Sequence, residues 1–258
     1  MDETPWKQVN IAYPGDDAER ERHAATHLAG ILPSAEADGL ITQWWFIRKG
    51  PWRVRYLPTN PDSDPVHALL IQGVSWTRDI YEPEIHAFGG PASMDLAHQL
   101  FHHDSRHLLP FLLKGAADRR ERSLILCTTF MRAAGLDINE QGDVWTQVAE
   151  HRTGITTTPV DPDVWRSFTR DTSHLLHGRP RTDALDHDWL AAFDNAGREL
   201  RTLREKGALT RGIRAITALH VIFHWNRMGL SATTQAFLSR AAKDAVFGST
   251  AEGHSRPL

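Results

Sequence analysis

The 258-residue chain contains a single cysteine, Cys127, and no uncharged apolar run of membrane-spanning length. One cysteine excludes an internal disulfide and a metal cage built from cysteines. A membrane helix needs about 18 apolar residues in succession, whereas the apolar runs here are much shorter. Residues 1–5 lack the basic and apolar regions of a secretory signal. We therefore expect a cytoplasmic protein that does not enter a membrane.

A strong excess of either charge is also absent, because 29 Lys and Arg face 32 Asp and Glu, which gives a net charge of −3. Proteins that bind nucleic acid usually carry a clear basic excess. No direct nucleic-acid binding is therefore expected. Hydrophobic residues make up 41% of the chain and charged residues 24%, so the chain can bury a core of ordinary size.

The first 90 residues show the pattern of a sheet. Residues 7–13 alternate between apolar and polar side chains, which is typical of a half-buried strand. Residues 41–49 and 52–56 are predicted to be two more strands, joined by a Gly-Pro turn into an antiparallel pair. Residues 74–84 are expected to be extended before the chain breaks at a Gly-Gly-Pro sequence.

Helical patterns dominate after residue 90. The predicted helices cover residues 16–32, 65–72, 93–100, 105–114, 119–134, 140–152, 163–174, 188–205, 213–228 and 231–245. Pro33 is expected to end the first of them, and Pro110 to interrupt the fourth. The predicted fold class is α+β, with an N-terminal antiparallel sheet and flanking helices followed by a mainly helical C-terminal half. We expect one domain over 1–248, sheet-rich to residue 90 and helical from 91, and a flexible tail over 249–258.

Arg53 and Arg55 are the first chemically informative pair. Residues two apart on a strand point to the same face, about 7 Å from each other. Two adjacent guanidinium forks suit bidentate binding of a carboxylate or phosphate. The alternative interpretation is a solvated pair on the outer face, with Trp52 and Val54 in the core. The sequence leaves both interpretations open.

His220 and His224 are the second candidate pair, because residues four apart share a helix face. A histidine pair at this spacing can bind zinc, but no Glu follows the first histidine and no third ligand is evident, so no metal is predicted. Each histidine is either a core residue or a catalytic one. The histidines between residues 98 and 107 are interpreted as structural. No cofactor is predicted.

Four blocks of the sequence carry a family resemblance. They are Trp44–Lys49 with Trp52–Tyr56, Ile80–Glu84 with Phe88–Gly90, Met94–Ser105, and His224–Met228. Together they resemble the C-terminal, glutamate-eliminating domain of class I lanthipeptide dehydratases and the stand-alone thiopeptide-type bacteriocin biosynthesis proteins. The blocks occur in the family's order, and the resemblance extends over nearly the whole chain.

The resemblance implies a lyase that acts on a ribosomally synthesised, post-translationally modified peptide. Such an enzyme removes glutamate from glutamylated Ser or Thr of a precursor peptide and leaves dehydroalanine or dehydrobutyrine. The implied partners are the precursor peptide and a separate glutamylation protein. The implied catalytic residues are Arg53, Arg55 and His224. The implied substrate-binding residues are Arg48, Tyr81, Glu84, His220, Asn226 and Arg227.

The sequence departs from the family pattern at two places. No arginine precedes the aromatic-Gly-Gly element at Phe88, and Trp52 stands where the family has a histidine. Which of His220 and His224 matches the family's catalytic histidine stays open. Two other functions are therefore considered, a thiopeptide pyridine synthase that joins two dehydroalanines in a formal [4+2] cycloaddition, and a non-catalytic peptide-binding partner of a dehydratase. The aromatic run at residues 44–46 also suggests a homodimer.

Overall fold

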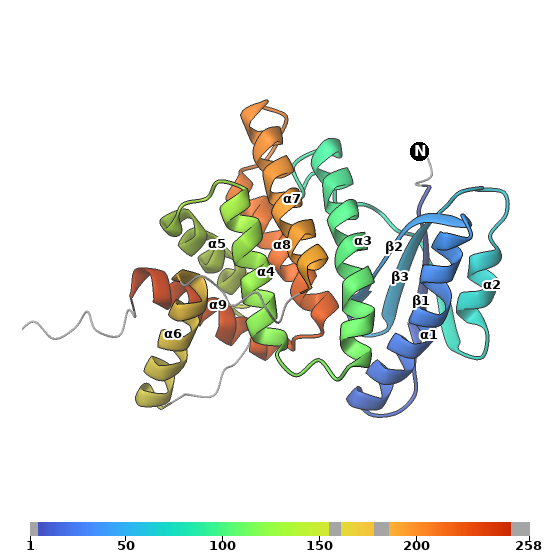
Figure 1. Cartoon of the computed structure of the whole chain (residues 1–258), viewed down its shortest axis with the longest axis horizontal. Helices are drawn as coiled ribbons and strands as arrows, with labels where there is room; N and C mark the ends of the chain where they lie inside the picture. Colours follow the sequence, from blue (N-terminus) through green and yellow to red (C-terminus); the bar gives the residue numbers. More distant parts are fainter. Residues whose placement is uncertain (1–4, 155–160, 178–185, 249–258) are drawn as a thin grey trace, which may run out of the picture.

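A computed structural model describes residues 5–154, 161–177 and 186–248 of the chain. A four-stranded antiparallel sheet occupies the N-terminal part, and helices make up most of the rest (Figure 1). This arrangement confirms the α+β class. No helix in the described part is long and apolar enough to cross a bilayer. The tail expected at 249–258 lies outside the described residues.

The sheet has the strand order β2-β3-β1-β4. Its strands are β1 (Lys7–Ala12), β2 (Ile41–Arg48), β3 (Trp52–Pro58) and β4 (Ser75–Asp79). The expected antiparallel pair of β2 and β3 is present, with Trp45 opposite Arg55. β1 lies between β3 and β4, and Val9 is opposite Val54.

The two faces of the sheet differ in character because alternate residues of a strand point to opposite sides. One face carries Val9, Ile11, Trp44, Phe46, Trp52 and Val54, which are all buried. Helices α1 (Asp17–Ala37) and α2 (Pro65–Ile71) lie beside the sheet (Figure 1). The indole of Trp44 donates to Glu36 of α1 at 2.8 Å. The other face is mixed polar and aromatic, and it contributes to the candidate site.

The remaining helices follow in chain order. They are α3 (Pro91–Leu113), α4 (Arg119–Ala133), α5 (Ile138–Glu150), α6 (Pro162–His177), α7 (His187–Glu205), α8 (Ile213–Met228) and α9 (Ala232–Phe247). Helix α3 joins the two halves because it packs along the β2 edge of the sheet (Figure 1). Ser105 of α3 accepts a hydrogen bond from the backbone N–H of Phe46 at 3.4 Å. This contact covers an edge that would otherwise expose unpaired backbone groups.

Both expectations about proline were wrong. Helix α1 continues through Pro33 to residue 37, and α3 is one helix that contains Pro110 in its last turns. A proline removes only one backbone donor, and here packing outweighs that loss. Ala35 is buried beyond Pro33, and Leu112 is buried beyond Pro110.

The aromatic run of β2 does not form an exposed surface. Trp44, Trp45 and Phe46 are completely buried within the chain. Trp45 packs against Phe101 of α3 and Phe223 of α8, with ring centroids 4.8 and 6.4 Å apart. The apolar area that suggested a homodimer is therefore satisfied inside one copy.

A shared carboxylate connects the sheet with the helical half. Glu21 of α1 forms an ion pair with Arg48 of β2 at 2.6 Å and also pairs with Arg119 at the start of α4. Both arginines donate to the backbone carbonyl of Met228, at 3.4 and 3.3 Å. Burial tends to raise the pKa of Glu21, but the two guanidinium groups outweigh it and lower the pKa. Four elements, α1, β2, α4 and α8, thus meet at one ion cluster.

Substitution of Gly229, directly after α8, tests how much the ion cluster around Glu21 contributes to stability. Its φ of +77° is left-handed, and an added Cβ would overlap the Arg48 guanidinium. Gly229→Ala should lower the free energy of unfolding in urea by about 2–4 kcal/mol, the sum of left-handed strain and overpacking. Gly207→Ala is the matched control, because Gly207 has a φ of +66° and open space around it. Equal losses in the two variants would contradict the proposed tight contact with Arg48.

Candidate functional site

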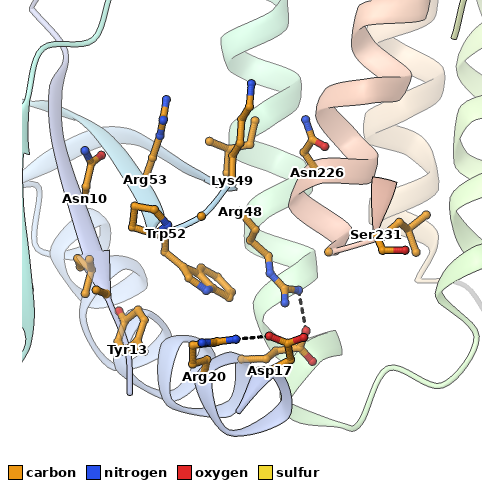
Figure 2. A pocket seen from close by; sticks show the side chains of 18 of the residues that line it. Asn10, Tyr13, Asp17, Arg20, Arg48, Lys49, Trp52, Arg53, Asn226 and Ser231 are labelled. Carbon is orange, nitrogen blue, oxygen red and sulfur yellow. Dashed lines mark hydrogen bonds and ion pairs between the residues drawn. The ribbon is translucent and has the colours of Figure 1, made fainter. Parts of the chain in front are cut away.

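A groove of about 1350 Å³ lies between the mixed face of the sheet and the C-terminal helices. Asn10 and Arg53 come from the sheet, Lys49 from the β2–β3 hairpin, and Asn226 and Ser231 from the end of α8 and the start of α9. Figure 2 shows the side chains of these elements around the open space. The volume exceeds that of most small-molecule pockets and suits an extended peptide.

Arg55 is the most deeply buried charge of the groove. Only 6% of its surface is exposed, and its Nε donates to Oε1 of Gln8 at 2.6 Å. Its guanidinium lies over the rings of Trp45 and Tyr81, at 4.3 and 4.1 Å from their centroids. Within the described residues, its Nη1 has no hydrogen-bond partner. Burial lowers the pKa of Arg55 to about 10, so the group remains charged at neutral pH.

Arg53 lies on the same face and also lines the groove. Its register partner on β1 is Asn10, and the two side chains point to the same side in Figure 2. The Nε atom of Arg53 is buried and has no partner among the described residues. The structure therefore brings the two predicted arginines together beside an accessible groove, with donors that are not used inside the protein.

A polar network behind these arginines was missed in the sequence. Gln8 Nε2 donates to Asp79 Oδ2 at 2.7 Å, and Asn10 Nδ2 donates to the same oxygen at 3.1 Å. The hydrogen bond from Asn10 is the main cause that lowers the pKa of Asp79. Gln8 thus orients Arg55 through its oxygen while its nitrogen is held by β4. The alternation of Gln8 and Asn10 with apolar residues in β1 was the available signal.

Tyr81 and Glu84 both influence Arg55, but they differ in their exposure to solvent. Tyr81 is buried, its hydroxyl is 2.8 Å from Nε2 of His98, and burial raises its pKa. Glu84 is exposed and lines the groove. Its negative charge supports the protonated form of Arg55. Tyr81 therefore supports the site from below, whereas Glu84 is accessible to a ligand.

Two other predicted binding residues lie at the rim. Arg48 lines the groove but is engaged by Glu21, and Figure 2 shows it turned away from Arg53. Asn226 lines the α8 wall, where its Oδ1 accepts from Nε2 of Gln235 at 3.0 Å.

His224 and Arg227 lie in the core of the helical half, not among the groove-lining residues. Both bind Oδ2 of Asp104, at 2.9 Å from His224 Nδ1 and 2.7 Å from Arg227 Nε. Trp189 donates to the other oxygen of Asp104 at 2.8 Å. Burial tends to raise the pKa of Asp104, but His224 and Arg227 lower it far below its usual range. Asp104 was assigned no function from the sequence, although an acidic residue within an apolar helix pattern was a usable signal.

His220 is also buried, in a cage of aromatic rings. The rings of Phe130, Phe88 and Phe101 have centroids 4.9, 5.2 and 5.9 Å from it. Neither ring nitrogen has a partner among the described residues, and burial lowers the pKa to about 3. The α8 wall of the groove instead carries Ile222, Phe223 and Asn226. The expectation that a histidine of α8 faces the substrate therefore has no geometric support.

Comparison with known families agrees with the sequence resemblance. Residues 6–246 match the family described as lantibiotic biosynthesis dehydratase C-term. Because this match covers nearly the whole chain, the protein belongs to that family. No curated protein sequence is significantly similar to it.

Solved structures share the fold at low sequence identity. The tRNA-dependent lantibiotic dehydratase MibB from Microbispora sp. 107891 has a TM-score of 0.67 and 20% identity. The match covers 96% of this chain, which spans only 28% of the MibB chain. The pyridine synthase TbtD from thiomuracin biosynthesis has a TM-score of 0.59, 15% identity, and coverages of 93% and 97%. TsrL has a TM-score of 0.55, 15% identity, and coverages of 94% and 98%.

We expect a large loss of stability when the charge of Asp104 is removed. Asp104→Asn leaves the buried Arg227 guanidinium without its counter-charge, so the free energy of unfolding should fall by about 3–5 kcal/mol. Asp118→Asn is the control, because Asp118 forms a half-exposed pair with Arg122 and should cost about 0–1 kcal/mol. Urea denaturation monitored by tryptophan fluorescence would measure both. Similar losses would show that Asp104 does not stabilise the helical half.

Two buried histidines predict a pH dependence of stability. Burial lowers the pKa of His98 to about 4 and that of His220 to about 3. The unfolded chain binds protons at these histidines below about pH 6.5, whereas the folded chain does not. Stability is therefore complete above pH 6.5 and falls toward pH 4, by about 1.4 kcal/mol per pH unit for each histidine. His220→Leu should reduce the slope by one proton, and an unchanged slope would contradict the assignment.

Proposed function

We propose that the chain is an enzyme of ribosomal peptide modification that binds a precursor peptide in the groove and eliminates glutamate from glutamylated Ser or Thr. The observation that carries this proposal is the Arg53–Arg55 row, with unused donors beside an open groove. Membership in the dehydratase C-terminal family supports peptide modification as the general role. The substrate would be a peptide that a separate protein has already glutamylated.

The two arginines fit the needs of this elimination. Removal of the α-proton places negative charge on the peptide carbonyl oxygen, and the glutamate then leaves as a carboxylate as the Cα–Cβ double bond forms. Because the two residues are two positions apart on a strand, their forks are about 7 Å apart on the same face. One can therefore hold the leaving carboxylate while the other stabilises the enolate oxygen. The buried position of Arg55 strengthens whichever of these interactions it makes, because the local dielectric is low.

We assign removal of the α-proton to Glu84. Three carboxylates line the groove in its described part, and two of them form ion pairs, Asp17 with Arg20 and Glu21 with Arg48 and Arg119. Glu84 is the one without such a pair. His224 donates or accepts at Asp104, and its Nε2 is buried without a partner, so we assign it the positioning of α8.

A pyridine synthase is the second candidate. It is supported by the structural match to the pyridine synthase TbtD, which has a TM-score of 0.59 over 93% of this chain. It is also consistent with the α8 wall, where Ile222, Phe223 and Asn226 provide shape and a hydrogen-bonding amide but no proton-transfer group. A cycloaddition between two dehydroalanines requires the peptide to be folded and polarised more than it requires a glutamate site.

Turnover of two synthetic peptides separates the candidates. The elimination proposal expects a glutamyl-Ser peptide to yield dehydroalanine and free glutamate, detected by mass spectrometry. Arg53→Lys or Arg55→Lys should each slow this at least about tenfold, equal to about 1.4 kcal/mol, because the ammonium lacks the bidentate fork. Glu84→Gln should slow it about a hundredfold or more.

Arg78→Lys and His103→Ala are the controls, since both residues lie outside the groove lining and should leave the rate unchanged. Cyclisation of a peptide with two dehydroalanines, without reaction of the glutamyl peptide, would replace elimination by the pyridine-synthase function. If the protein binds the peptide but catalyses neither reaction, the remaining candidate is a non-catalytic peptide-binding partner of a dehydratase.

A further inference from the structure

The helical wall of the groove, opposite Arg53 and Arg55, also carries a guanidinium group, that of Arg152. Arg152 follows α5 and lines the groove together with Gln235 and Ser231. Its Nε and Nη2 donate to Oε1 of Gln235 at 3.0 and 2.6 Å. Gln235 is almost fully buried and is itself fixed, because its Nε2 donates to Asn226 and to the carbonyl of Leu230.

The glutamine contact repeats the one around Arg55 on the sheet, although Nη1 of Arg152 also donates to the backbone carbonyl of His151 at 3.2 Å. In both, a buried glutamine oxygen accepts from the arginine Nε, and the glutamine nitrogen is bound elsewhere. A neutral amide orients a guanidinium without neutralising its charge, unlike a carboxylate. Arg55 and Arg152 are therefore both held in place with their positive charge uncompensated.

The charge balance of the groove supports the same conclusion. Its other basic residues on α1, β2 and α4 are paired with Asp17 and Glu21. In the described part of the chain, Lys49, Arg53, Arg55 and Arg152 form no ion pair with a carboxylate, although they line the same groove. Among the groove carboxylates in the described residues, Glu84 alone is not engaged in an ion pair and can balance part of the charge of these four cations. The excess is local, because the whole chain has a net charge of −3.

We propose that Arg152, oriented by Gln235, forms a second anion-binding subsite for a carboxylate side chain of the peptide that occupies the groove. The inference rests on the proposed peptide-binding function and specifies its substrate: a segment with an Asp or Glu residue placed to reach the helical wall. Ser231 and Ala232 at the start of α9 line the same wall, so the positive end of that helix dipole favours the same charge. Glu84 and the apolar side chains of Ile222 and Phe223 suit a peptide better than a polyphosphate chain.

Peptide binding measured without turnover tests the subsite. The probe is a fluorescein-labelled peptide of Gly and Ser with two Glu residues, prepared at several spacings, and its matched Gln peptide. Fluorescence anisotropy at low salt should give tighter binding of at least one acidic peptide than of its Gln counterpart. Arg152→Gln should weaken binding of that acidic peptide about five- to tenfold and leave the Gln peptide unchanged. Raising the salt concentration should reduce the difference.

Arg166→Gln is the matched control, because Arg166 lies on the exposed surface of α6 and not in the groove lining. Gln235→Leu should reduce the preference for acidic peptide, because Arg152 loses its orienting partner. Equal binding of acidic and Gln peptides at every spacing, or an equal effect of Arg152→Gln on both, would overturn the subsite.

A short single-stranded RNA that binds more tightly than the acidic peptide, and loses this affinity in Arg152→Gln, would overturn it in favour of a nucleic-acid ligand. The outcome is separate from that of the proposed reaction. Charge-selective binding without turnover would support the subsite and refute the reaction. Turnover with equal KM for acidic and Gln-substituted substrates, in both wild type and Arg152→Gln, would support the reaction and refute the subsite.

Discussion

One buried carboxylate, Asp104, organises the helical half of the protein. It accepts hydrogen bonds from three side chains on two other helices, Trp189 of α7 and His224 and Arg227 of α8. A buried charge is tolerated only when it is paired and hydrogen-bonded, so α3, α7 and α8 can pack together only in the register that satisfies this group. The C-terminal family block, His224–Met228, thus has a structural part, His224 and Arg227, which bind Asp104, and a groove-facing part at Asn226.

The groove depends on this packing because α8 is its helical wall. The sheet wall is defined independently by strand alternation, which places Arg53, Arg55, Gln8 and Asn10 on one face. Where the walls meet, Glu21 connects α1, β2 and α4, and the arginines paired with it bind the end of α8. The relative position of the two walls is therefore set by an ion cluster outside the arginine row, which leaves the row free to bind a ligand.

The reaction proposed for the groove uses positive charge that the fold does not neutralise. A guanidinium held by a glutamine oxygen keeps both its orientation and its full attraction for an anion. Such preorganised charge in a partly desolvated groove is the principal means of stabilising an enolate or a departing carboxylate. The substrate preference inferred at Arg152 has the same cause, since both walls of the groove present cations that a neutral peptide would leave unpaired.

The sequence alone determined the α+β class, the β2–β3 pair and the shared face of Arg53 and Arg55, because these follow from local periodicity. It also determined the family, through short blocks in a fixed order. Only the tertiary structure decided that His220 and His224 are buried, since helix spacing shows which residues share a face but not what covers that face. The continuation of α1 and α3 through proline was likewise decided by packing. Arg152 and Gln235 are separated by 83 positions, and no local pattern connects residues so distant, so this pairing exists only once α5, α8 and α9 have packed together.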